Sequence, residues 1–121
     1  MGDRGNIVIE KDKSGLFPAP VYFYTHWSGS TIKETLKDAL VRGKARWNDP
    51  SYLARVIFCE MVGDNDGVTG YGISTAIGDN GHNLLCVNID EKKVIERDRR
   101  TNEPVKEWTF EEFVNVCFDC D

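Results

Sequence analysis

The sequence has no long hydrophobic run, no excess of basic residues and no internal repeat. Its most apolar stretch, residues 52–62, is interrupted by Arg55 and Glu60 and is shorter than the roughly 20 apolar residues that span a bilayer. The net charge of -5 argues against nucleic-acid binding, which needs a basic surface to replace the counterions around phosphates. Residues 1–6 carry charges where an export signal has an apolar run, and Asn6 does not fit a myristoylation signal. We therefore expect a cytoplasmic protein without a membrane or nucleic-acid partner.

Cysteines are few, and their spacing predicts no metal site. Cys117 and Cys120 form a single C-x-x-C pair, with neither a second pair nor a nearby histidine to complete a zinc site. Because no export signal is present, we expect all four cysteines to be reduced, with Cys59 and Cys86 buried as small apolar residues. No cofactor is predicted.

The length of 121 residues and the 40% hydrophobic content fit one domain, 1–121, that folds without metal or disulfides. Period-two patterns predict strands, and period-3.6 patterns predict helices. The expected order is β-β-α-α-β-β-β-α, which is an α+β fold: an antiparallel β-sheet of about five strands with the helices mainly on one face. The expected strands are 6–12, 21–25, 71–77, 82–90 and 92–98, and the expected helices are 31–43, 49–63 and 109–117.

Capping residues predict where the helices begin and end. Two capping boxes are expected, in which a threonine and a glutamate three residues later satisfy the first N–H groups. Asp49 followed by Pro50 is typical of a helix start. A glycine is typical of a helix end, and Gly43 is expected to end its helix in a left-handed conformation. The capping boxes are Thr31 with Glu34 and Thr109 with Glu112, and the terminating glycines are Gly43 and Gly63.

Turn signals organise the last three predicted strands as an antiparallel meander. Asp66-Gly67 predicts a turn before the first of them, and Asn80-Gly81 a tight hairpin between the first and the second. The middle strand, 82–90, is apolar on both faces, so we expect Leu85, Val87 and Ile89 at the centre of the sheet. Residues 99–104 are expected to be a charged link before the last helix.

Residues 25–31, which we call the corner, join the second predicted strand to the first predicted helix. The unpaired N–H groups of a helix start carry partial positive charge, so the corner predicts an anion site. Trp27 offers a ring face for a base, and Arg55 on the second helix is expected to point at a carboxylate or into the same cleft. The predicted ligand-binding residues are Tyr24, His26, Trp27, Ser28, Gly29, Ser30, Thr31, Lys33 and Arg55.

Catalysis at the corner has weaker support. His26 could act as base for Ser28 or Ser30, but side chains so close in sequence rarely reach the required geometry, and no G-x-S-x-G or Walker motif is present. We therefore assign no catalytic residue and favour a protein that is not an enzyme. In a purely structural alternative, the hydroxyls only cap the helix and Trp27 packs on the core.

Five segments give the chain a wider resemblance. "GDRGNIVI", "YTHWSG", "RWNDPSYLARVIFCEM", "GYGIS" and "WTFEEF", in that order, resemble a family of small uncharacterised proteins found in bacteria and their phages. Phe23 and Ser28 depart from the Leu and Gly of that pattern. The resemblance implies no activity. A phage origin would be compatible with a host-inhibiting, anti-defence protein that sequesters a nucleotide signal or blocks a host protein.

Three functional hypotheses follow. The first is a non-enzymatic protein that binds a phosphorylated small molecule or nucleotide at the corner and the following turn, residues 25–33. The second is a small hydrolase that acts on a nucleotide-like substrate. The third is a protein-protein interaction module that inhibits a host partner. Assembly into a homo-oligomer is left open.

Overall fold

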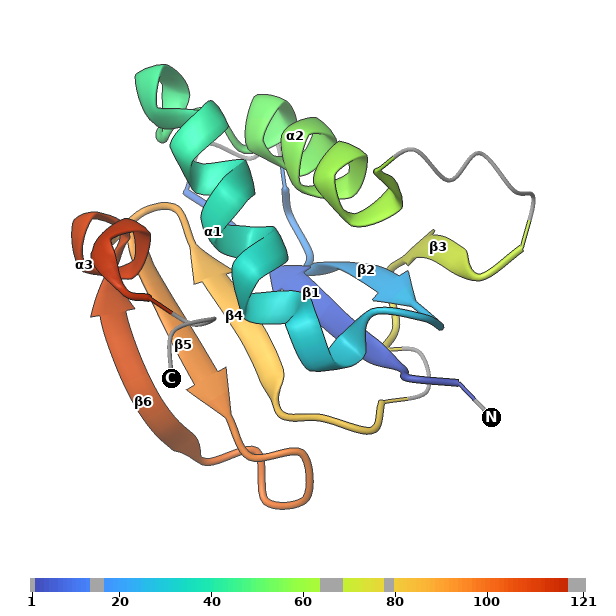
Figure 1. Ribbon diagram of the computed structural model, residues 1–121. Coiled ribbons are helices and arrows are strands. Elements are labelled where there is room, and N and C mark those ends of the chain that lie inside the picture. Colours follow the sequence, from blue (N-terminus) through green and yellow to red (C-terminus); the bar gives the residue numbers. More distant parts are fainter. Residues whose placement is uncertain (1, 14–16, 64–68, 78–79, 118–121) are drawn as a thin grey trace.

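The structure is a computed structural model that describes residues 2–13, 17–63, 69–77 and 80–117 (Figure 1). Helices and a mixed sheet confirm the α+β class. The strands are β1 (Gly5–Ile9), β2 (Val21–Thr25), β3 (Tyr71–Ser74), β4 (Leu84–Asn88), β5 (Lys93–Arg97) and β6 (Pro104–Thr109). The helices are α1 (Ile32–Arg42), α2 (Pro50–Val62) and α3 (Phe110–Asn115), with short 3-10 turns η1 (Gly29–Thr31) and η2 (Lys44–Arg46).

The sheet has six strands in the order β3-β2-β1-β4-β5-β6. The pairings β1 with β2 and β4 with β5 are antiparallel, as predicted. However, β1 and β4 pair in parallel, with Ile7 opposite Leu85, so the expectation of a purely antiparallel sheet is wrong. Both strands are buried over most of their length, which explains why they lie together at the centre.

The predicted Asn80-Gly81 hairpin is also wrong, because β3 is not a neighbour of β4. Instead, β3 pairs antiparallel with β2 at the edge of the sheet, with Ile73 opposite Phe23. β3 also ends at Ser74 rather than continuing to Ile77. Its partly exposed residues suit an edge, whereas the buried β1 takes the central place beside β4.

The sequence reading missed β6. The sequence places Pro104 in the charged link and Thr109 at the start of the last helix, and it predicts no element for residues 105–108, because Lys106 and Glu107 hide the strand pattern. In the structure, β6 pairs antiparallel with β5 and places Val94 opposite Trp108. Trp108 is buried. The meander consists of β4, β5 and β6, whereas the expected meander consisted of β3, β4 and β5.

The three helices cover one face of the sheet, as Figure 1 shows. The core on this face joins strand residues such as Phe23 and Val87 to helix residues such as Leu53 and Phe113. Val87 has no exposed surface, which confirms its central place. On the opposite face, a smaller cluster consists of Val8, Leu84, Cys86 and Ile95 with Tyr22 against it.

Helix ends follow the capping rules at some positions only. Asp49 caps α2 through the N–H of Tyr52, and Thr109 and Glu112 form the predicted capping box of α3. The Thr31 box is wrong: Thr31 makes no side-chain cap bond to α1, because the chain enters that helix through η1.

Gly43 and Gly63 both end helices, but for different reasons. Gly63 ends α2 as predicted and has a positive φ of 59°. Gly43 has a φ of -93°, so the expected left-handed conformation is wrong there. A Cβ at Gly43 would lie 2.7 Å from Leu53 Cδ2, so close packing of α2 against α1 accounts for this glycine.

The cysteines differ from one another. Cys86 is buried as predicted, whereas Cys59 is exposed, contrary to prediction. Both are free thiols, but Cys117 is disulfide-bonded, so the expectation of reduced thiols is wrong for that residue. Cys120 and the predicted Asp66-Gly67 turn lie outside the described residues. In the part of the chain that the structure describes, no helix is long and apolar enough to cross a membrane.

Candidate functional site

Hydrogen bonds within residues 25–28 fix the conformation of the corner. β2 ends at Thr25, whose Oγ1 accepts hydrogen bonds from the N–H groups of Trp27 at 3.2 Å and Ser28 at 3.3 Å. The Ser28 hydroxyl also lies 3.0 Å from Thr25 Oγ1. These contacts form a hydroxyl-based turn, so part of the predicted donor set is satisfied before α1 begins.

Asp3 occupies the position at which the sequence predicted a bound anion. Its Oδ2 accepts hydrogen bonds from the N–H of Ser30 at 2.9 Å and from the Ser30 hydroxyl at 2.5 Å. The Asp3 carbonyl accepts from the Gly29 N–H at 2.7 Å, and the Asp3 N–H donates to the His26 carbonyl at 2.7 Å. The Ser30 hydroxyl, followed by His82, lowers the pKa of Asp3 from 3.8 to about 2. The corner therefore binds a carboxylate from the same chain.

His82 was not predicted and packs against this carboxylate. Its Nε2 lies 2.6 Å from Asp3 Oδ1, and its side chain is 38% exposed. The ring lies against Gly29, where an added Cβ would meet His82 Cδ2 at 2.7 Å and the Arg4 carbonyl oxygen at 2.8 Å. Gly29 is thus required by the packing of His82 and of the amino-terminal segment.

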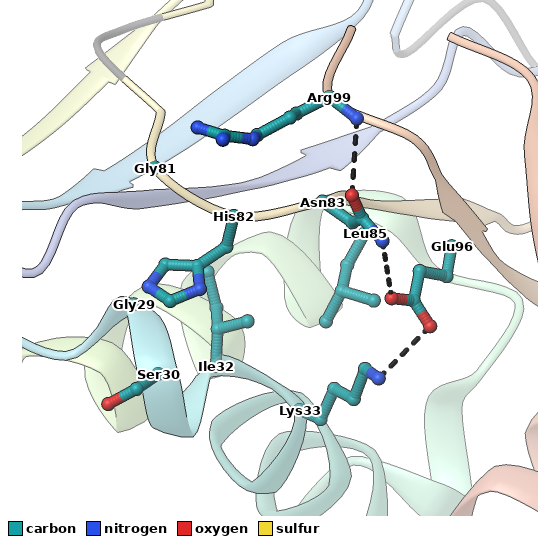
Figure 2. Close-up of a pocket in the computed structure, with 10 residues that line it drawn as sticks. All are labelled: Gly29, Ser30, Ile32, Lys33, Gly81, His82, Asn83, Leu85, Glu96 and Arg99. Atoms are coloured by element: carbon teal, nitrogen blue, oxygen red, sulfur yellow. Dashed lines mark hydrogen bonds and ion pairs between the residues drawn. The ribbon is translucent and has the colours of Figure 1, made fainter. Parts of the chain in front are cut away.

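A polar pocket of about 370 Å³ opens beside the first turn of α1 (Figure 2). Four segments form it: η1 with the start of α1, residues 81–85, β5, and the turn after β5. Its lining residues are Gly29, Ser30, Ile32, Lys33, Gly81, His82, Asn83, Leu85, Glu96 and Arg99. Three of the predicted residues, Gly29, Ser30 and Lys33, are among them.

Glu96 is the negative group of the pocket. Lys33 Nζ lies 3.0 Å from Glu96 Oε1, and Asn83 Nδ2 donates to Glu96 Oε2 at 2.9 Å, so the two side chains approach it from different sides (Figure 2). Burial raises the pKa of Glu96, but the hydrogen bonds from Asn83 and Lys33 outweigh it and the net pKa is lowered. Asn83 Oδ1 accepts from the Arg99 N–H at 3.2 Å, which fixes the turn that carries the Arg99 side chain.

Other predicted residues of the corner lie outside this pocket. Tyr24 Oη lies 2.9 Å from His26 Nδ1, and the His26 and Trp27 rings meet edge to face with centroids 4.5 Å apart. Trp27 is 54% exposed, so the alternative in which it packs on the core is wrong. Ser28 belongs to the Thr25 turn, and Thr31 donates its hydroxyl to the Ser28 carbonyl at 3.3 Å.

Arg55 does not join the corner. Its guanidinium lies over the Tyr52 ring, 5.8 Å from the centroid, and the residue is exposed. It lines an apolar groove with Phe17 and Phe58, which is separate from the polar pocket. Arg55 was expected to point at a carboxylate or into the cleft of the corner, and among the described residues it does neither.

Sequence reasoning missed Asp3, His82, Asn83, Glu96 and Arg99. The Asp3–Ser30 and Asp3–His82 contacts join positions 27 and 79 residues apart, and no local pattern links such positions. His82 and Asn83 follow Asn80-Gly81, which was assigned to a hairpin. Among the described residues, no group of three or more His, Cys, Asp or Glu is arranged to hold a metal ion.

Comparison of the chain with family models, curated proteins and solved structures gives no match. The resemblance to the bacterial and phage family therefore stays a prediction.

Proposed function

We propose that the chain binds a small phosphorylated molecule in the polar pocket beside α1. The observation that carries this proposal is that Lys33, His82 and Arg99, from three separate segments, line one pocket. Ammonium, imidazole and guanidinium groups are the side chains that bind phosphate oxygens by charge-assisted hydrogen bonds. The pocket keeps three of the predicted residues but lies beside the corner, because Asp3 fills the corner itself.

Glu96 narrows the class of ligand. Its lowered pKa keeps it ionised at neutral pH, so it repels a bare phosphate and accepts hydrogen bonds from hydroxyl or amine groups. A ligand with a phosphate directed at Arg99 and His82 and with hydroxyls directed at Glu96 satisfies both signs of charge. A nucleotide, with its phosphate and ribose hydroxyls, has this arrangement.

Binding without turnover fits the geometry best. A nucleophilic hydroxyl needs contact with its base, yet Ser30 and His82 both contact the carboxylate of Asp3, which lies between them. One observation favours hydrolysis as a second function. Asp3 holds His82 through Nε2 at 2.6 Å, and among the described residues no hydrogen bond is found for Nδ1, so this nitrogen could accept a proton from water.

Arg99 and Arg100 provide a matched test. Both are exposed, and each fixes its turn through a backbone N–H, but only Arg99 lines the pocket. We expect calorimetry to detect binding of at least one compound in a panel of nucleoside mono-, di- and cyclic phosphates and sugar phosphates. Arg99→Ala should weaken that binding by about tenfold or more, the effect of losing one charge-assisted hydrogen bond. Arg100→Ala should retain the parent affinity.

Two outcomes would contradict the proposal: no binding across the panel, or equal losses in the two arginine variants. Product formation distinguishes the second function, because only a hydrolase would release phosphate or cleave the bound compound. His82→Gln should then abolish turnover, whereas simple binding predicts no product from the parent protein.

A further inference from the structure

The two edges of the sheet differ in how they are protected. β6, at one edge, carries Pro104, Lys106 and Glu107, which are typical of an edge that resists pairing with another strand. β3, at the other edge, lies in the stretch 69–77, which contains no proline and no charged residue. Ile73 and Ile77 in this stretch are 58% and 49% exposed. Within the described stretch 69–77, the β3 edge therefore lacks the usual barriers to strand pairing.

The backbone of Ile73, in the middle of β3, faces away from β2. The Gly70 carbonyl accepts a hydrogen bond from the His26 N–H at 2.8 Å, so it points toward β2. The C=O of one residue and the N–H of the next, which share a peptide bond, point in opposite directions. The N–H and C=O of a single strand residue point to the same side, so the side alternates from one residue to the next. It follows that Gly72 and Ser74 bond to β2, whereas Ile73 directs its N–H and C=O to the open edge.

An apolar groove of about 360 Å³ runs along this edge, between α2 and β3. Arg55 is the one charged residue in its lining, and its guanidinium lies over Tyr52. Ile73 forms one wall, so an apolar side chain on a strand added beside β3 would lie directly at the groove. The apolar lining residues include Phe17, Val21, Phe23, Ala54, Phe58 and Ile73.

We propose that two copies of the chain pair antiparallel through β3, with Ile73 opposite Ile73 of the second copy. Antiparallel pairing of one strand with its own copy satisfies a two-fold axis, so the same surface serves both partners and the assembly closes as a dimer. The absence of charge in 69–77 removes the repulsion that two identical charged edges would suffer. Each Ile73 then covers the groove of the other copy, and neither polar pocket loses a lining residue to the interface.

Ile73→Lys and Val105→Lys test the interface as a matched pair. Ile73 is 58% exposed on the β3 edge, and Val105 is 57% exposed on the β6 edge. Light scattering coupled to size exclusion, over a range of concentrations, should show a dimer for the parent and for Val105→Lys, and a monomer for Ile73→Lys that still unfolds cooperatively. Because dimer formation stabilises the folded chain, the melting temperature of the parent should rise with concentration, whereas that of Ile73→Lys should not. A parent that is monomeric at its highest soluble concentration, or an Ile73→Lys variant that keeps the parent's mass, would overturn the proposal.

A cross-link tests the register and does not depend on the behaviour of the lysine variant. Directly opposed residues of antiparallel strands have Cα atoms about 4.5–5.5 Å apart, within the range that a disulfide spans. In a Cys59→Ser background, which removes the exposed thiol, oxidised Ile73→Cys should run as a covalent dimer on a non-reducing gel. Val105→Cys in the same background should remain a single chain. Equal cross-linking of the two variants, or none at residue 73, would exclude pairing through β3.

Discussion

At the scale of single residues, Asp3 decides what the corner can do. Helix-start N–H groups attract anions whatever their source, and here the nearest carboxylate belongs to the same chain. The same carboxylate orients His82 at the edge of the pocket. Asp3 thus satisfies the corner and builds one wall of the neighbouring site.

Asp3→Asn tests this double role through pH. The folded-state pKa of Asp3 is lowered from 3.8 to about 2, so the ionised carboxylate stabilises the fold above about pH 4, and this contribution is lost as the pH falls through 2. Thermal melts should show Asp3→Asn below the parent at neutral pH, with the gap narrowing between pH 4 and 2.

Asp38→Asn is the control, because Asp38 is exposed on α1 and its replacement removes the same charge. It should follow the parent across the pH range. A gap between Asp3→Asn and the parent that stays constant down to pH 2 would show that the carboxylate charge contributes nothing at the corner.

At the scale of helices and strands, two identical capping patterns have different outcomes. Thr109 and Glu112 form both hydrogen bonds of the capping box, whereas Thr31 forms no cap bond to α1. The difference lies in how the chain enters each helix. An extended residue precedes α3, while η1 leads into α1 and places Thr31 outside the capping conformation.

We therefore expect Thr109→Ala to lower the free energy of unfolding by about 1 kcal/mol, the usual effect of losing an N-cap. Thr31→Ala should stay within about 0.5 kcal/mol of the parent, since an exposed hydroxyl bonded to the nearby Ser28 carbonyl contributes little. Urea denaturation followed by circular dichroism measures both values. Equal losses, or a larger loss at Thr31, would mean that the capping box of α3 is not what stabilises its start.

The sequence was a good guide to elements whose pattern is local. Apolar periodicity placed α1, α2, β1, β2, β4 and β5, and Asp49 marked the start of α2. The sequence did not predict all strand pairings correctly, because Asn80-Gly81 favours a hairpin wherever it occurs. The strand that lies beside β4 is instead decided by burial, and β1 is buried on both faces. β6 was missed because its alternation places charges on exposed positions and leaves Trp108 as the one buried residue.

At the scale of the whole molecule, the pocket depends on topology more than on any motif. The parallel pairing of β1 with β4 brings the amino-terminal segment and residues 81–83 to the start of α1, so Asp3, Ser30 and His82 meet. Local patterns could identify Gly29, Ser30 and Lys33, because they lie at a helix start. They could not identify His82 or Arg99, whose places depend on strand order.

A two-dimensional amide NMR titration with nucleoside 5′-monophosphates tests the central claim most directly, because it reports where a ligand binds as well as whether it binds. We expect the largest shifts at Lys33, His82, Asn83 and Arg99, with residues near the apolar groove, such as Arg55, unchanged. Arg99→Ala should reduce these shifts at the same ligand concentration. Shifts centred on His26 and Trp27, or an unchanged spectrum at saturating ligand, would contradict a phosphate-binding pocket beside α1.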